Sequence, residues 1–179
     1  SWVIVEKRDK SQTMSRESTP APIRIDERKH VEEPLLAQLK GLDWEVIDLD
    51  SKQHPADSHR ASFAEVLMDS VLKEQLREIQ PWLEADQVED LVKQLTASFP
   101  GNNLLQNNQH AFKLLTEGAT IAENRKTGER SPTVHFVDFD HPEKNRFIAL
   151  CQLKVRILGT DHHILPDIVL FLNGIPVVV

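Results

Sequence analysis

A single carboxylate stands at the head of the most apolar segment of this sequence. Asp167 follows Pro166 and precedes the run IVLFLNGIPVVV, which contains no other charged residue. An aspartate in this position can bond local backbone amides in a turn, or it can hold a hard cation such as Mg²⁺. Spacing alone favours the structural role, so a catalytic role requires a partner for Asp167.

The residues after Asp167 indicate a β-hairpin. Asn173-Gly174 is a strong signal for a two-residue turn between the strands DIVLFLN and IPVVV. With the turn centred there, Asp167 lies opposite residues near 179 to 181, so a group that completes a site with it is expected at or just beyond Val179. Because neither strand alternates polar with apolar residues, both faces of the hairpin are expected to be covered.

A further strand is predicted over FIALCQLKVRIL, residues 147–158. Alternate residues of a strand share a face, so Gln152, Lys154 and Arg156 are expected to lie together. That face is apolar where the strand begins and polar where it ends. This pattern is typical of a strand that is covered by a helix at one end and lines a cleft at the other.

Helical periodicity dominates the residues that must position these strands. Helices are predicted from Pro34 to Gly41, from the capping pair Ser62 and Glu65 to Pro81, from a second capping pair, Asp86 and Glu89, onward, and over 102–118. WEVIDL is predicted as a short strand, and ATIAEN and TVHFVDFD as strands after Gly118. The fold class is therefore α/β in the α+β sense, with helices packed on a mixed or antiparallel sheet.

Composition limits the function classes. The chain has 179 residues, a net charge of −7 and one cysteine, which fits a reducing, cytoplasmic setting. No broad basic face is visible, so strong nonspecific binding to nucleic acid is not expected, although a local metal-dependent site on DNA is compatible with this charge. The apolar tail is too short to span a membrane. The Asp and His groups at 138–141 and 161–163 are expected to be polar loops.

The chain is expected to consist of a polar leader, residues 1–30, and one domain, residues 31–179. It begins with Ser and stops inside a hydrophobic run. We therefore expect it to be part of a longer protein whose C-terminal hairpin is truncated here.

A resemblance carries the functional argument further. The stretch NRFIALCQLKVRILGTDHHILPDIVLFLNGIPVVV resembles the N-terminal domain of the type I restriction enzyme R subunit, which cleaves and translocates DNA. The motif positions are Asn145, Phe147, Gln152, Pro166, Asp167, Asn173, Gly174 and Pro176. The helical region from HVEEPLLAQLKGLDWEVID onward fits less specifically, and the resemblance covers roughly residues 30–179.

The resemblance implies a restriction-endonuclease-like core of the PD-(D/E)xK type. In that fold Asp167 and a Glu on the next strand would hold Mg²⁺, and a Lys two residues after the Glu would assist the attacking water. A helix glutamate, Glu32 or Glu33, is a candidate to complete the site, although an acid in the first turn of a helix is also favoured by the helix dipole. The expected Glu-x-Lys lies past Val179, and the basic residue expected just before Pro166 is absent, since Ile164 and Leu165 stand there.

The same resemblance gives roles to the polar strand residues and names partners. Gln152 could touch a phosphate or orient a ligand, and Lys154 and Arg156 could contact DNA phosphates; a structural hydrogen bond and a solvated strand end are the alternatives. The modification and specificity subunits of the system would be partners. ATP would act only through a motor domain that is absent here. Because the Glu-x-Lys and this motor are both missing, this piece is expected to be inactive alone.

A second hypothesis belongs to a different class. The chain could be a non-catalytic α+β module that docks onto partner subunits or binds DNA, with Asp167 in a structural role. An acid near position 181 of the parent protein, followed by Lys two residues later, would favour the nuclease; a neutral residue there would favour the module.

Overall fold

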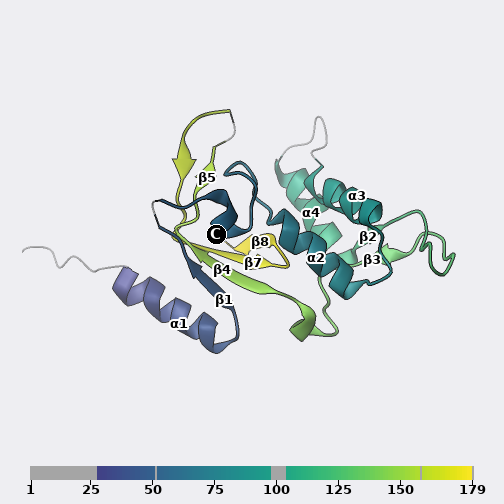
Figure 1. The fold of residues 1–179 in the computed structure, drawn as a ribbon, viewed down its shortest axis with the longest axis horizontal. Coiled ribbons are helices and arrows are strands. Elements are labelled where there is room, and N and C mark those ends of the chain that lie inside the picture. Colours follow the sequence, from purple (N-terminus) through teal and green to yellow (C-terminus); the bar gives the residue numbers. More distant parts are fainter. Residues whose placement is uncertain (1–27, 51, 98–103, 158, 179) are drawn as a thin grey trace, which may run out of the picture.

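The computed structural model describes residues 28–50, 52–97, 104–157 and 159–178, so residues 1–27 of the predicted leader lie outside the described residues. In this part of the chain four α-helices accompany one four-stranded sheet and two short strand pairs (Figure 1). The elements are η1 (Arg28–Glu32), α1 (Glu33–Gly41), β1 (Glu45–Asp48), η2 (Pro55–Ser58), α2 (Asp69–Ile79), α3 (Ala85–Thr96), α4 (Leu104–Glu117), β2 (Ala119–Thr120), β3 (Thr133–Val134), η3 (Pro142–Lys144), β4 (Phe147–Cys151), β5 (Val155–Arg156), β6 (His163–Ile164), β7 (Ile168–Leu172) and β8 (Ile175–Val178).

The main sheet is mixed, with strand order β1-β4-β7-β8. β1 pairs parallel with β4, whereas β4 with β7 and β7 with β8 pair antiparallel. This arrangement confirms the predicted α+β class with helices on a mixed sheet. α1 runs alongside β1 in the opposite direction, so the N-terminus of α1 and the C-terminal ends of β1 and β4 lie at one end of the sheet (Figure 1).

Helix α2 joins two hydrophobic clusters. Its residues Leu72 and Leu76 pack in a cluster with α3, α4 and the β2–β3 pair. Met68, at the N-cap of α2, and Val71 pack instead on the main sheet, in a cluster with Ile148, Leu150, Leu153, Val169, Phe171 and Leu49. One helix therefore holds the sheet and the other helices together. No helix of the described residues is both long and apolar enough to cross a bilayer.

The predicted turn at Asn173-Gly174 is confirmed. Both residues have positive φ, 52° and 82°, as a tight hairpin turn with a type I′ backbone requires. The turn lies against the start of α2, where the Met68 backbone N–H donates a hydrogen bond to the Gly174 carbonyl at 2.9 Å. A Cβ atom at Gly174 would lie 2.7 Å from the Met68 carbonyl oxygen and 2.9 Å from the Leu72 nitrogen, so only glycine fits.

The predicted start of the second helix is wrong. α2 begins at Asp69, seven residues after Ser62. Tertiary contacts take the carbonyls that an earlier helix would need: the Phe63 carbonyl accepts from the Arg156 backbone N–H at 2.8 Å, and the Glu65 carbonyl accepts from the Arg60 guanidinium at 2.9 Å. The local capping signal is thus overridden by long-range partners.

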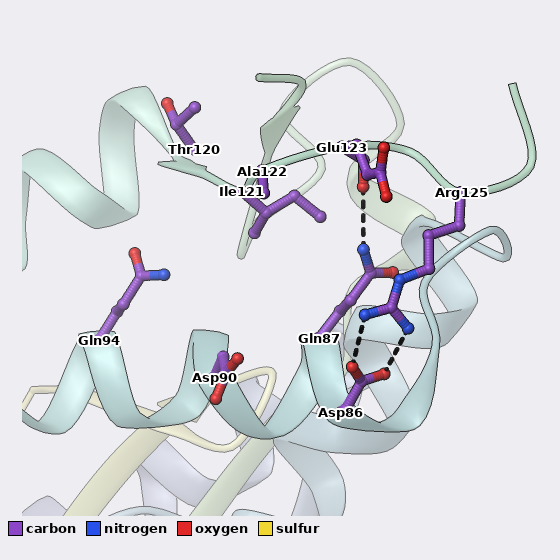
Figure 2. A pocket seen from close by; sticks show the side chains of 9 residues that line it. All are labelled: Asp86, Gln87, Asp90, Gln94, Thr120, Ile121, Ala122, Glu123 and Arg125. Carbon is purple, nitrogen blue, oxygen red and sulfur yellow. Dashed lines mark hydrogen bonds and ion pairs between the residues drawn. The ribbon is translucent and has the colours of Figure 1, made fainter. Parts of the chain in front are cut away.

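The capping pair predicted for α3 is also displaced. The Gln87 side chain accepts the Glu84 backbone N–H at 3.1 Å. Asp86 instead binds the Arg125 guanidinium at 2.7 and 3.0 Å (Figure 2). Arg125 belongs to the loop between β2 and β3, so the acid at the helix start anchors that loop rather than capping the helix.

Two strand predictions need correction. The single strand expected over residues 147–158 breaks after Cys151, where Gln152 adopts φ of 56°, and resumes only as β5. The expected complete cover of the hairpin is also wrong for β8, because Val177 and Val178 are 46% and 54% exposed. A register shift between Leu170 and Phe171 accompanies this exposed edge.

Candidate functional site

The end of the β4–β7 pair brings two predicted site residues into contact. Cys151 pairs with Ile168, and one position further the Gln152 backbone N–H donates to the Asp167 carbonyl at 3.0 Å. The Gln152 side chain then donates from Nε2 to Asp167 Oδ1 at 3.1 Å. Asp167 is exposed, so its carboxylate stands at the surface with an amide from the neighbouring strand against it.

Glu32 and Glu33 lie at the junction of η1 and α1, at the same end of the sheet as the C-terminus of β4 (Figure 1). Glu33 is exposed and Glu32 is partly buried. Within the described ranges neither is paired with Asp167, and no three His, Cys, Asp or Glu side chains gather closely enough to hold a metal ion. The carboxylates described here therefore do not form a complete metal site by themselves.

The two predicted DNA-binding cations do not share one strand face with Gln152, because the strand is interrupted. Lys154 Nζ lies 5.0 Å from the centre of the Phe63 ring. Arg156 donates from Nε to the Thr160 carbonyl at 2.8 Å and from Nη2 to the Asp161 carboxylate at 3.2 Å. Both side chains thus have partners inside the domain. Contact between either of them and DNA phosphates stays a prediction.

Two buried polar residues that the sequence does not single out support this end of the sheet. Gln53 is 7% exposed and Arg60 is 3% exposed. The Gln53 amide bonds the backbone of Gln152 and Lys154, and Arg60 donates to the Lys154 carbonyl at 2.7 Å. Burial lowers the pKa of the Arg60 guanidinium, and the charge of Glu65 opposes this effect. Both residues stand in the polar stretch DSKQHPADSHR, where no sequence signal separates a buried side chain from a solvated one.

Asn145 and Asn173, two positions of the motif that supports the resemblance, have structural roles. Asn173 is fully buried, and its side chain accepts the Arg146 backbone N–H at 2.7 Å and donates to the Phe136 carbonyl at 2.9 Å. It also donates to Asn145 Oδ1 at 2.8 Å. Asn145 in turn accepts the Asp138 backbone N–H at 2.9 Å. These bonds attach the hairpin turn to the start of β4 and leave the exposed polar groups of the site at the other end of the sheet.

Fold and contacts together define an α+β domain whose mixed sheet presents an exposed aspartate, held by a glutamine, beyond the paired ends of two antiparallel strands. The chain belongs to the family described as type I restriction enzyme R protein N terminus, whose model matches residues 24–179.

Two relatives agree with this assignment. Over 150 residues the chain is 33% identical to the HindI endonuclease subunit of a type I restriction enzyme from Haemophilus influenzae, a match that covers 83% of this chain and 14% of that protein. Over 158 residues it is 23% identical to a protein assigned as the MjaIXP endonuclease subunit from Methanocaldococcus jannaschii, covering 87% and 15%. The chain thus corresponds to an N-terminal region and spans a small fraction of these relatives.

Proposed function

We propose that this chain is part of the DNA-cleaving subunit of a type I restriction-modification system, and that it contributes Asp167 to a Mg²⁺-dependent site for phosphodiester hydrolysis. The observation that carries the proposal is the contact between Gln152 and Asp167 at the exposed end of the β4–β7 pair. Family membership supports a DNA substrate, and it supports the modification and specificity subunits as partners in the cytoplasm.

The donor chemistry fits Mg²⁺ in part. Carboxylate oxygens are the hard ligands that Mg²⁺ prefers, and Asp167 presents such a group to solvent. A bound Mg²⁺ would neutralise phosphate charge and lower the pKa of a coordinated water. Gln152 contributes by donating to one oxygen of Asp167, which fixes the rotation of the carboxylate while leaving further lone pairs for a ligand.

The register of the hairpin supports a second ligand on the strand that continues β8. Leu170 is opposite Val178. Three residues before Leu170 stands Asp167, and three residues after Val178 comes position 181, so an acid at 181 would face Asp167 if the pairing continues. A Lys two residues later would point to the same side of the strand. Glu32 or Glu33 is proposed as a further acid at this end of the sheet, and ATP would act through a separate motor region.

Substitution of Asp167 in the intact subunit, assembled with its partners, tests the proposal. Asp167→Ala and Asp167→Asn should abolish DNA cleavage while ATP hydrolysis continues, because each removes a metal ligand and leaves the motor untouched. Asp140→Ala is the matched control: Asp140 is also exposed but lies in the loop before η3, and its variant should cleave normally. Wild-type cleavage by Asp167→Ala would refute the proposal and favour a docking or DNA-binding role for the domain.

A further inference from the structure

We propose that Gln53 is a positioning residue for this site: its buried amide holds the chain bend at residues 152–154 and thereby aims Gln152 at Asp167. The inference rests on the proposed function, because it assigns the bend a role in the nuclease site. It concerns a residue that neither the sequence motifs nor the family resemblance singles out.

Gln53 bonds the backbone of the bend just beyond the end of the β1–β4 pairing. The pairing of β1 with β4 ends where the Leu49 backbone N–H donates to the Cys151 carbonyl at 3.2 Å. Immediately beyond that point, Gln53 Nε2 donates to the Gln152 carbonyl at 2.8 Å, and Gln53 Oε1 accepts the Lys154 backbone N–H at 2.9 Å. One side-chain amide thus supplies both a donor and an acceptor to the backbone on either side of Leu153. A third bond, from Nε2 to the Asp50 carbonyl at 3.0 Å, ties Gln53 to its own loop.

The bend needs such support. Gln152 has φ of 56°, a left-handed conformation that is unfavourable for a residue with a side chain. Without the hydrogen bonds from Gln53, the chain is free to continue as an ordinary extended strand through Lys154. Because side chains on a strand alternate, a change of this kind redirects the Gln152 side chain and breaks its contact with Asp167.

Arg60 holds the same bend from its far end. Its Nη2 donates to the Lys154 carbonyl at 2.7 Å, while Nε and Nη1 donate to Ser58 Oγ at 2.8 Å and the Glu65 carbonyl at 2.9 Å. Gln53 therefore binds the two peptide groups that flank Leu153, and Arg60 binds the next peptide group, after Lys154. Because Arg60 also bonds Ser58 and Glu65, its substitution would disturb the 58–65 segment as well as the bend. Substitution of Gln53 therefore tests the bend more directly.

Gln87 provides a matched control. It is 8% exposed, close to the 7% of Gln53, and its side chain likewise bridges two backbone groups: it accepts from the Glu84 N–H at 3.1 Å and donates to the Glu123 carbonyl at 2.9 Å. Figure 2 shows the bond from Gln87 to Glu123, which joins the start of α3 to the segment between β2 and β3. Gln53→Ala and Gln87→Ala therefore each remove a buried amide that bridges backbone groups, three groups for Gln53 and two for Gln87, and only the first removes it at the proposed site.

The first measurement is amide hydrogen exchange of the intact subunit. Gln53→Ala should accelerate exchange in the segment around residues 152–156, because the Lys154 N–H loses its acceptor. Gln87→Ala should leave that segment unchanged. Gln53→Glu keeps the size and the acceptor but lacks the donor to the Gln152 carbonyl, so it should show the same defect in weaker form if the alanine variant does not fold.

The second measurement is the Mg²⁺ concentration that gives half-maximal DNA cleavage. Loss of a residue that orients a metal ligand typically changes affinity or activity about 10- to 100-fold, so Gln53→Ala should raise this concentration by about that factor, and Gln87→Ala should not. Equal Mg²⁺ dependence in the two variants would overturn the inference, even where hydrogen exchange differs. If Asp167→Ala cleaves normally, it is the proposed function that fails, and the exchange result still decides whether Gln53 holds the bend.

Discussion

Asn173 shows how one residue can serve a motif without doing chemistry. An amide side chain buried in an apolar environment is costly unless its donors and acceptor are satisfied, and Asn173 satisfies them with Arg146, Phe136 and Asn145. It also adopts the positive φ that asparagine tolerates better than most residues. The position therefore combines a turn requirement with a hydrogen-bond requirement, which explains a polar residue in the middle of this hairpin.

The lowered pKa of Asp138 should make the free energy of unfolding depend on pH. Its carboxylate accepts the His141 backbone N–H at 2.9 Å, which lowers the pKa of Asp138, with smaller help from the charges of His141 and Lys144. A group whose pKa is depressed by folding stabilises the fold above its unfolded pKa, about 3.9 for Asp, and this contribution is lost as pH falls through the folded value. Asp138→Asn should therefore lower the free energy of unfolding at pH 7, and the difference from wild type should shrink toward pH 3. Urea denaturation at both pH values measures it, and an equal difference at both would contradict the assignment.

The site residues differ in how far the sequence could reveal them. Asp167 and Gln152 could be predicted as candidates, because one heads an apolar hairpin and the other sits where a strand turns polar. Their mutual contact could not, since it depends on the positive φ of Gln152. Gln53 and Arg60 were missed for a physical reason: their burial is created by tertiary contacts roughly one hundred residues away, and their local sequence resembles a solvated loop.

At the scale of elements, the hairpin turn and the start of α2 form one unit. The Gly174 carbonyl accepts from the Met68 N–H, and the glycine leaves no room for a Cβ atom against α2. The position of the Asn173-Gly174 turn therefore fixes the position of the first turn of α2. A glycine whose neighbours are backbone atoms is a strict requirement, because backbone atoms cannot move aside as a flexible side chain can.

Gly174→Ala should destabilise the domain more than an alanine substitution at another glycine that has a positive φ but no atoms close to the added methyl group. Gly128→Ala is the control, since Gly128 has φ of 75° and a methyl group added there would have open space within 4 Å, whereas Gly174 has both a positive φ and backbone atoms within 3 Å. We expect a cost of about 1 kcal/mol for the control and at least about 2 kcal/mol more for Gly174→Ala. Urea midpoints of the two variants give the difference, and equal midpoints would show that the turn can move away from α2.

Element boundaries show which signals the sequence carries. The Asn-Gly turn, the helix ending at Gly118 and the β1 strand could be predicted because local residues determine them. The start of α2 could not, because the carbonyls of Phe63 and Glu65 bind Arg156 and Arg60 instead of helical partners. The break after Cys151 could not be predicted either, because the alternating pattern continues through a bend that the distant side chains of Gln53 and Arg60 help to stabilise.

At the scale of the whole molecule, α2 makes the two hydrophobic clusters interdependent. Adjacent residues Val71 and Leu72 face different clusters, and both are almost completely buried. Loss of α2 would expose the sheet and the α3–α4 region together. We therefore expect the described residues to unfold as one cooperative unit.

Two tryptophans allow this expectation to be measured. Trp44 stacks near the Phe147 ring at 5.1 Å, beside the sheet, and Trp82 packs against the cluster of α2, α3 and α4. In variants that retain only one of the three tryptophans, the fluorescence transition in urea should coincide with the far-UV circular dichroism transition for Trp44 and for Trp82 alike. A fluorescence transition that precedes the loss of helix signal in either variant would show that the two clusters unfold separately.

The bond from Met68 to Gly174 also sets an order of events during protein synthesis. The ribosome releases the first turn of α2 roughly one hundred residues before the turn that completes it. Until the C-terminal hairpin emerges, the nascent helix has an apolar face without the strands that bury it. The chain therefore passes through an interval during synthesis in which this apolar surface is exposed to aggregation.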